Sequence, residues 1–103
     1  SLLTHVRKGD ISNVHSLRRG AAEAIEVTAH GDPRSSKVVG RRLDDITLPK
    51  GVTIGAIVRD EKVLIAHRHV VVETDDHVII FLLDRKQIGA VEKLFAVGFG
   101  FFS

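Results

Sequence analysis

The chain has 103 residues, 44% hydrophobic and 27% charged, a balance typical of one globular domain rather than a disordered segment. Its formal net charge is only +2, its basic residues are mostly interleaved with acidic ones, and it has no Trp or Tyr, which together argue against nucleic-acid binding. It has no cysteine, as fits a reducing cytoplasmic compartment, and no apolar run of the ~20 residues that would insert in a membrane.

The first third of the chain gives weak signals. Residues 10–17 alternate loosely between polar and apolar, as in a short strand. Residues 21–29 are ambiguous, because their alanines and glutamates favour a helix while Glu23, Ile25 and Val27 would share one face of a strand. Periodicity alone leaves both alternatives open.

A helix is expected over residues 37–46, where Val39, Leu43 and Ile46 recur at helical spacing after a capping serine. The β-branched, almost continuously apolar residues 52–58 predict a buried strand. A polar turn joins it to residues 63–66, so the two runs predict a hairpin.

The last third predicts an edge strand at residues 70–73, a polar turn, and a buried strand at residues 77–83. Asp84 is expected to cap a closing helix, with Gln87 at the position of a capping box. The predicted fold class is therefore α/β of the α+β type, a small mixed β-sheet with two helices in the order β-α-β-β-β-α.

Three strings of residues carry a resemblance to a known family. They are S-K-V-V-G-R-R-L at residues 36–43, L-P-K-G-V-T-I-G-A-I-V-R at residues 48–59 and V-V-V-E-T-D-D-H-V-I-I-F at residues 70–81. In this respect the chain resembles the TrkA-C family, the C-terminal domain of regulators of conductance of potassium. The resemblance implies a strand at residues 22–29.

The resemblance also implies a domain organisation. Residues 1–20 would be the end of an upstream nucleotide-binding domain and a linker, residues 21–96 the TrkA-C domain, and residues 97–103 a Phe/Gly-rich C-terminal tail. The phenylalanines near the end are Phe95, Phe99, Phe101 and Phe102. Such a tail either folds back on its own domain or is disordered, or it packs against another subunit.

The function implied by the resemblance is regulatory. The chain would be a domain of a cytoplasmic potassium-uptake (Trk) subunit, peripheral at the cytoplasmic face of the bacterial inner membrane. It would pair as a homodimer and transmit ligand state to the Trk membrane channel subunit. The sequence holds no Gly-x-Gly-x-x-Gly motif, so NAD or ATP is expected only in upstream domains and no cofactor is assigned to these residues.

A ligand site is predicted from basic residues near the hairpin ends, where Arg59, His67, Arg68 and His69 could hold an anion by charge-assisted hydrogen bonds. Ordinary surface charge is the alternative interpretation. If the site exists, the chain would instead be a sensor of a cyclic dinucleotide, another anion or a metal. The spacing of its histidines and acids is not specific for a metal, so no metal ligand is assigned.

Catalysis is not expected. The chain has no cysteine, and Ser35 and Ser36 lie where a helix cap is predicted rather than in a nucleophile elbow. No nucleophile can be paired with a base, so no catalytic residue is assigned and the chain is predicted not to be an enzyme.

Overall fold

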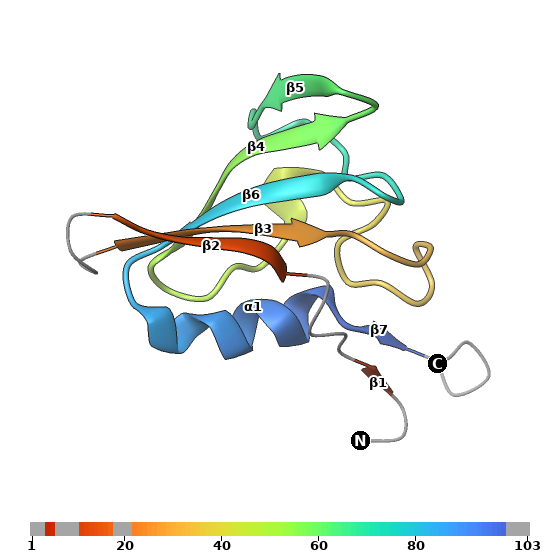
Figure 1. The fold of residues 1–103 in the computed structure, drawn as a ribbon. Coiled ribbons are helices and arrows are strands. Elements are labelled where there is room, and N and C mark those ends of the chain that lie inside the picture. The colour runs from red at the N-terminus through yellow and green to blue at the C-terminus, as the bar shows by residue number, and fades with distance from the viewer. Residues whose placement is uncertain (1–3, 6–10, 18–21, 99–103) are drawn as a thin grey trace.

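The computed structural model describes residues 4–5, 11–17 and 22–98, and its centre is a five-stranded sheet (Figure 1). The strand order is β2 (Ile11–Leu17), β3 (Ala22–Thr28), β6 (His77–Leu82), β4 (Val52–Arg59) and β5 (Lys62–Ile65). A separate two-residue pair joins β1 (Thr4–His5) to β7 (Val97–Gly98). No helix within the described ranges has both the length and the apolar character needed to span a bilayer.

The strand composition explains the sheet. Val, Ile and Thr dominate β4 and β6, and such residues favour pleated, buried positions. A two-residue turn closes the β4–β5 hairpin, with Asp60 at φ 49° and Glu61 at φ 67°, the left-handed pair of a type I′ turn. Its twist matches the twist of the strands it joins.

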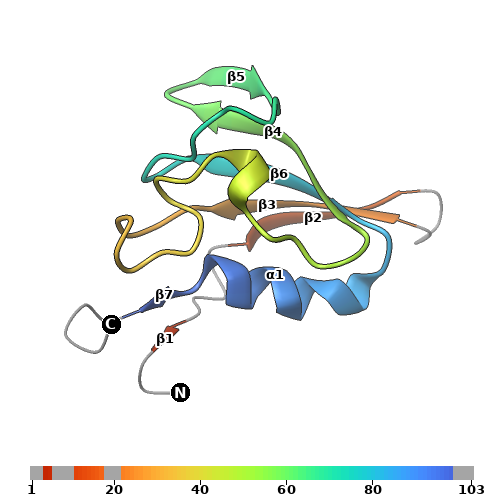
Figure 2. The ribbon, with the colours of Figure 1, turned by 180° about the vertical axis from the view of Figure 1, so that it is seen from behind.

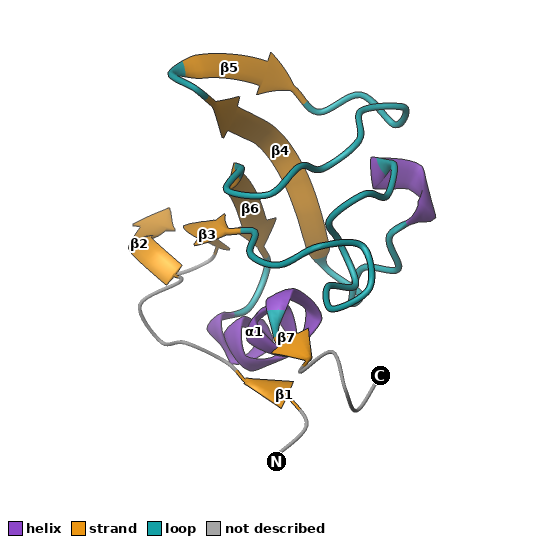
Figure 3. Ribbon diagram, turned by 90° about the vertical axis from the view of Figure 1, so that its right-hand side faces the viewer, coloured by secondary structure: helices purple, strands orange, loops and turns teal. Residues whose placement is uncertain are grey.

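One face of the sheet is covered and the other is open. The cover consists of α1 (Ile88–Phe95) and the irregular segment formed by residues 29–51, which we call the covering segment (Figures 2 and 3). Side chains from both cover elements and from the central strands fill the core between the layers, among them Ile25, Val27, Val38, Val39, Ile57, Val78, Ile80, Leu82, Val91 and Phe95.

The entry into α1 is fixed by a capping box. Asp84 accepts the N–H of Lys86 at 2.9 Å, while its own N–H donates to Oε1 of Gln87 at 3.2 Å. The chain then makes a 3-10 turn, η3 (Arg85–Gln87), before the α-helix begins. Gln87 also donates its side-chain amide to the carbonyl of Lys50, which ties the helix start to the loop before β4.

The helix expected over residues 37–46 is wrong. The chain makes turns and a single 3-10 turn there, η2 (Leu43–Asp45). Ser36 does cap a turn, because its Oγ accepts the N–H groups of Val38 and Val39 at 3.0 Å. Gly40 then takes φ 84°, and this left-handed residue ends any right-handed helix.

The strand expected at residues 70–73 is also wrong. The backbone of this stretch pairs with the covering segment rather than with a sheet strand: Gly40 donates to the carbonyl of Val72 at 2.7 Å, and Leu43 donates to that of Val70 at 2.9 Å. It contributes one isolated bridge, Arg42 with Val71, instead of a sheet strand.

The α+β class, the small sheet and the closing helix are confirmed. Two details differ. All strand pairings in the described residues are antiparallel, so the sheet is not mixed, and these residues hold one α-helix rather than two. The strand that the resemblance implied at residues 22–29 is present as β3.

The proposed division at residue 20 stays a prediction. The structure adds that β2, which precedes this boundary, pairs antiparallel with β3 along its length. Of the tail, residues 97–98 form β7, and residues 99–103 lie outside the described part of the chain. Phe95 belongs to α1 and is buried in the core.

Candidate functional site

Arg59, at the end of β4, is held by acids on the neighbouring loop. Its Nε and Nη2 donate to the two carboxylate oxygens of Asp76 at 2.8 and 2.7 Å, and its Nη1 lies 2.9 Å from Oε2 of Glu73. Nη2 also reaches the carbonyl of Val71 at 2.8 Å. The side chain of Asp76 is only 1% exposed, so this fork-shaped pair satisfies a buried carboxylate. The hydrogen bond with Asp76 raises the pKa of Arg59.

A second charged cluster lies on the covering segment. Arg42 donates to both carboxylate oxygens of Asp44, at 3.0 and 2.6 Å, and its Nη2 lies 2.7 Å from Nδ1 of His69. Because a guanidinium only donates, Nδ1 of His69 is the acceptor in this hydrogen bond. The bond from Arg42 lowers the pKa of Asp44 below its ordinary value, and the same bond raises the pKa of Arg42.

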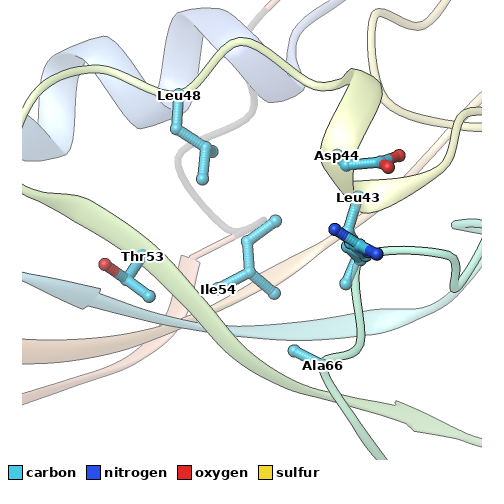
Figure 4. Close-up of a pocket in the computed structure, with 7 residues that line it drawn as sticks. Leu43, Asp44, Leu48, Thr53, Ile54 and Ala66 are labelled. Atoms are coloured by element: carbon cyan, nitrogen blue, oxygen red, sulfur yellow. The ribbon is translucent and has the colours of Figure 1, made fainter.

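Beside this cluster is an open hollow of about 220 Å³. Its lining is mostly aliphatic with two charged residues, and it consists of Leu43, Asp44, Leu48, Thr53, Ile54, Ala66 and Arg68. Figure 4 shows Leu43, Leu48, Ile54 and Ala66 arranged around this space, from the covering segment, β4 and the chain after β5. The hollow is small, and its charged residues suit a polar group attached to a short apolar body.

The four predicted ligand residues fall into different settings. Arg59 has its guanidinium engaged by Asp76, whereas Arg68 lines the hollow and His69 is bonded to Arg42. His67 is exposed, and its backbone N–H donates to the carbonyl of Ile65 at 2.8 Å. The ligand hypothesis stays a prediction, and of its four residues Arg68 is the one in the lining of the hollow.

Sequence reasoning missed Arg42, Asp44 and Asp76 as members of these clusters. Arg42 and Asp44 were placed on an expected helix, where residues two apart do not face one another. A turn in their place would have allowed the pair, and Gly40 is the residue that signalled it. Asp76 lies in the polar turn predicted before residue 77, yet its side chain is buried and accepts the N–H of Glu73 at 2.8 Å.

The open face of the sheet exposes several large apolar side chains. The register places Val63 and Ile65 of β5 on the same face as Val58 and Ala56 of β4, and this face continues to β6. Val63 is 64% exposed, Ile65 63% and Phe81 43%. Large apolar side chains gathered on one exposed surface mark an interaction site more often than an ordinary surface.

Within the described residues, no group of three or more His, Cys, Asp or Glu side chains is arranged to hold a metal ion.

The TrkA-C domain model matches residues 32–96, which is more than half of the chain. The chain belongs to the TrkA-C domain family. The matched residues include the covering segment, β4, β5, β6 and α1, while β2 and β3 precede them. The TrkA-C match thus contains the hollow, both charged clusters and the hairpin.

Two similar proteins carry the same description. It is 69% identical over 99% of its length to the Trk system potassium uptake protein TrkA of Halomonas elongata, and it covers 22% of that protein. It is 65% identical over 92% of its length to the protein of the same description from Vibrio alginolyticus, of which it covers 21%. The chain therefore spans about a fifth of the length of these relatives.

Proposed function

We propose that this TrkA-C domain is a non-enzymatic regulatory module of a potassium-uptake subunit. It pairs with a second copy of itself and transmits the ligand state of neighbouring domains to a Trk membrane channel subunit, at the cytoplasmic face of the membrane. A change of arrangement between paired domains is the means of transmission, and only a ligand with different affinities for two arrangements drives it.

The observation that carries the proposal is the 69% identity to a Trk system potassium uptake protein over nearly the whole chain. The apolar open face of the sheet supports the pairing part, since Val63 and Ile65 are each more than 60% exposed. The two charged clusters support the non-enzymatic part of the proposal, because their acids and guanidinium groups are paired with one another.

A chimera tests this function. In a bacterium lacking its own TrkA, we express the Halomonas relative with its matching segment replaced by this chain, and measure potassium uptake at low external potassium. A matched truncation ends where the replaced segment begins. The expected result is uptake close to that of the intact relative for the chimera and a clear loss for the truncation.

Two outcomes would contradict the proposal. An undiminished uptake by the truncated protein would remove the regulatory role from this segment. A chimera that accumulates as folded protein but gives no uptake would show that this chain cannot perform the role of its relative. Immunoblotting of soluble protein controls for expression in both strains.

The second candidate function is a small-ligand sensor, and the hollow beside Arg68 and Asp44 favours it. A cyclic dinucleotide or another anion would place its charge against Arg68 and its apolar part against Leu43 and Ile54. Ligand that binds only the folded form raises the melting temperature. The test is a thermal-shift panel of nucleotides, cyclic dinucleotides and divalent cations.

A pair of variants makes this panel specific. Arg68→Met removes the positive charge at the hollow, and Lys93→Met removes an equal charge from an exposed position on α1. The sensor proposal predicts that an anion stabilises the wild type and Lys93→Met but not Arg68→Met. A panel without any shift, or equal shifts in both variants, would leave the hollow without a function in ligand binding.

A further inference from the structure

The hollow lies beside a stretch of β4 that has a partner strand on one side only. β5 pairs with β4 from Ala56 to Arg59, whereas β6 pairs with β4 from Val52 onward. The lining of the hollow includes Ile54 from the stretch that β5 does not reach, and Ala66 from the chain just after β5. The hollow therefore lies at the place where β5 stops running beside β4.

The direction of the backbone groups in this stretch follows from the ladder with β6. Leu83 donates to the carbonyl of Gly51 at 3.1 Å, which places that carbonyl on the β6 side. Backbone groups of successive residues alternate between the two sides of a strand, so those of Thr53 also face β6 and those of Ile54 face the opposite side. The N–H of Ile54 is thus a donor on the side of the hollow.

Arg68 supplies the positive charge of the hollow. Its backbone carbonyl accepts the N–H of Asp44 at 3.0 Å, which fixes the base of its side chain against the covering segment. Among the described residues no acid forms an ion pair with its guanidinium, whereas Arg42, Arg59 and Arg85 each have such a partner. The planar array of N–H donors on a guanidinium matches the two oxygens of a carboxylate.

The charges around the hollow sum to a single positive charge. Asp44 also lines the hollow, but both of its carboxylate oxygens accept from Arg42, at 3.0 and 2.6 Å. These two charges balance, and the charge of Arg68 remains. The hollow therefore complements a ligand with one negative charge better than a zwitterion or a doubly charged phosphodiester.

The aliphatic lining sets the size and character of the rest of the ligand. Figure 4 shows Leu48 and Ile54 extending toward each other across the space, with Leu43 and Ala66 beside them. The volume of about 220 Å³ corresponds to roughly seven water molecules. On that scale an aliphatic acid of about four to six carbon atoms fills the hollow, and a cyclic dinucleotide is several times too large to enter it whole.

We propose that the hollow binds a small aliphatic monocarboxylate. The carboxylate accepts hydrogen bonds from the guanidinium of Arg68 and the N–H of Ile54, and the alkyl chain lies against Leu43, Leu48 and Ala66. This inference rests on the ligand-sensor candidate and names the ligand class of that same site. Such a ligand touches the covering segment and β4 together, so its binding stabilises the packing of one against the other.

A series of ligands tests this chemistry. The probe is isocaproate, titrated into the isotope-labelled chain and followed by amide NMR spectra. We expect saturable shifts of the amide resonances of Ile54, Ala66 and Arg68. Isocaproamide keeps the shape without the charge, and acetate keeps the charge without the alkyl chain. Each is expected to bind at least about tenfold more weakly than isocaproate.

Two substitutions test the place of binding. Arg68→Met removes the guanidinium, and Ala66→Leu fills part of the hollow. The matched controls are Lys93→Met and Ala90→Leu, which make the same changes at exposed positions of α1. Both hollow variants are expected to raise the dissociation constant of isocaproate at least about tenfold, and both controls to leave it unchanged. Circular dichroism checks folding; if Ala66→Leu does not fold, Arg68→Met and the ligand series decide.

The possible results separate this ligand class from the sensor candidate itself. Equal affinities for isocaproate and isocaproamide, an unchanged affinity in Arg68→Met, or shifts confined to residues outside the hollow would each overturn the monocarboxylate site. Binding of a cyclic dinucleotide without binding of isocaproate would overturn the ligand class and leave the sensor candidate standing. A spectrum that no probe changes would overturn both. The chimera measures the role in potassium uptake independently of these titrations.

Discussion

Asp76 is a carboxylate with almost no exposure to solvent, and Arg59 makes that burial tolerable. The side chain of Arg59 is one-quarter exposed, so it links the surface to the buried acid. The acid also orders the backbone around it, because its side chain accepts the N–H of Glu73 and its carbonyl accepts that of Ala29 at 2.8 Å. This residue pair joins the end of β4 to the loop before β6.

Replacing Arg59 by Met is expected to lower the free energy of unfolding by about 3 kcal/mol, because it leaves a buried carboxylate without its counter-ion. Urea denaturation measures the change. The control is Arg42→Met, which breaks the exposed pair with Asp44 and should cost much less. Equal losses in the two variants would contradict a special role for the buried pair.

Asp32 is expected to make the free energy of unfolding depend on pH. Its Oδ1 accepts the N–H groups of Arg34 and Ser35, both at 2.9 Å, and the hydroxyl of Ser35 at 3.0 Å. The hydrogen bond from the Ser35 backbone is the largest cause that lowers the pKa of Asp32. A lowered pKa in the folded state means that the stabilisation is present above the unfolded value, about 3.9, and is lost as the pH falls below it.

Asp32→Asn tests this sign. Between pH 6 and pH 2 the free energy of unfolding of the wild type is expected to fall more steeply below about pH 4 than that of Asp32→Asn, because the amide does not titrate. The measurement is urea denaturation at a series of pH values. Parallel curves for the two proteins would show that Asp32 contributes nothing to acid sensitivity.

At the scale of elements, β4 contains an irregularity at Gly55. The register between β4 and β6 shifts between Ile54 and Ala56, and the ring of Phe81 lies across Gly55. A Cβ at Gly55 would come within 2.2 Å of Cε2 of Phe81. The missing side chain therefore gives the ring its place on the open face.

Two glycine substitutions are expected to have opposite effects. Gly55→Ala displaces the ring of Phe81 and should destabilise the protein by about 1 kcal/mol. Gly89→Ala, in α1 with nothing within 4 Å of a new Cβ, should stabilise it by about 0.5–1 kcal/mol. Thermal and urea denaturation check both signs. If Gly55→Ala left the stability unchanged, both alone and in combination with Phe81→Ala, the close approach of Gly55 to the ring of Phe81 would not contribute to stability.

The elements that local sequence determines were predictable. Runs of β-branched residues identified β4 and β6, and Asp84 with Gln87 identified the start of the closing helix. The covering segment was not predictable in the same way. Val39, Leu43 and Ile46 are buried as their spacing indicated, but they are buried in turns. Gly40, Leu43 and Asp44 of this segment donate backbone hydrogen bonds to residues 68–72. Partners so distant in the chain leave no periodic signal.

The candidate site shares that limit. Arg68 lines the hollow, and its basic character was visible in the sequence. Asp44 and Leu48 reach the same hollow only because the covering segment folds against residues 66–72. Arg59 had the expected charge, but the burial of its partner Asp76 is a tertiary property that a polar turn motif does not reveal.

For the whole molecule, the covering segment supplies as much of the core as a regular element does. Val38 is fully buried although it lies outside any helix or strand, and it belongs to the same apolar cluster as Val78 of β6. The core is thus closed on one side by turns whose backbone groups bond to residues 68–72.

Val38→Ala is therefore expected to cost about 2 kcal/mol, close to the cost of Val78→Ala in the central strand, because both leave a cavity in one core. Val63→Ala, at an exposed position, should cost far less in the monomer. Urea denaturation at low protein concentration compares the three. A small loss of stability for Val38→Ala would show that the covering segment relaxes and fills the cavity.

The short pairing of β1 with β7 has a mechanical consequence. Thr4 lies beside Gly98, so the two ends of the described fold leave from one spot, at the opposite end of the molecule from β5 (Figure 1). A rotation of the domain about that pairing would therefore displace β5 more than the elements that lie close to it.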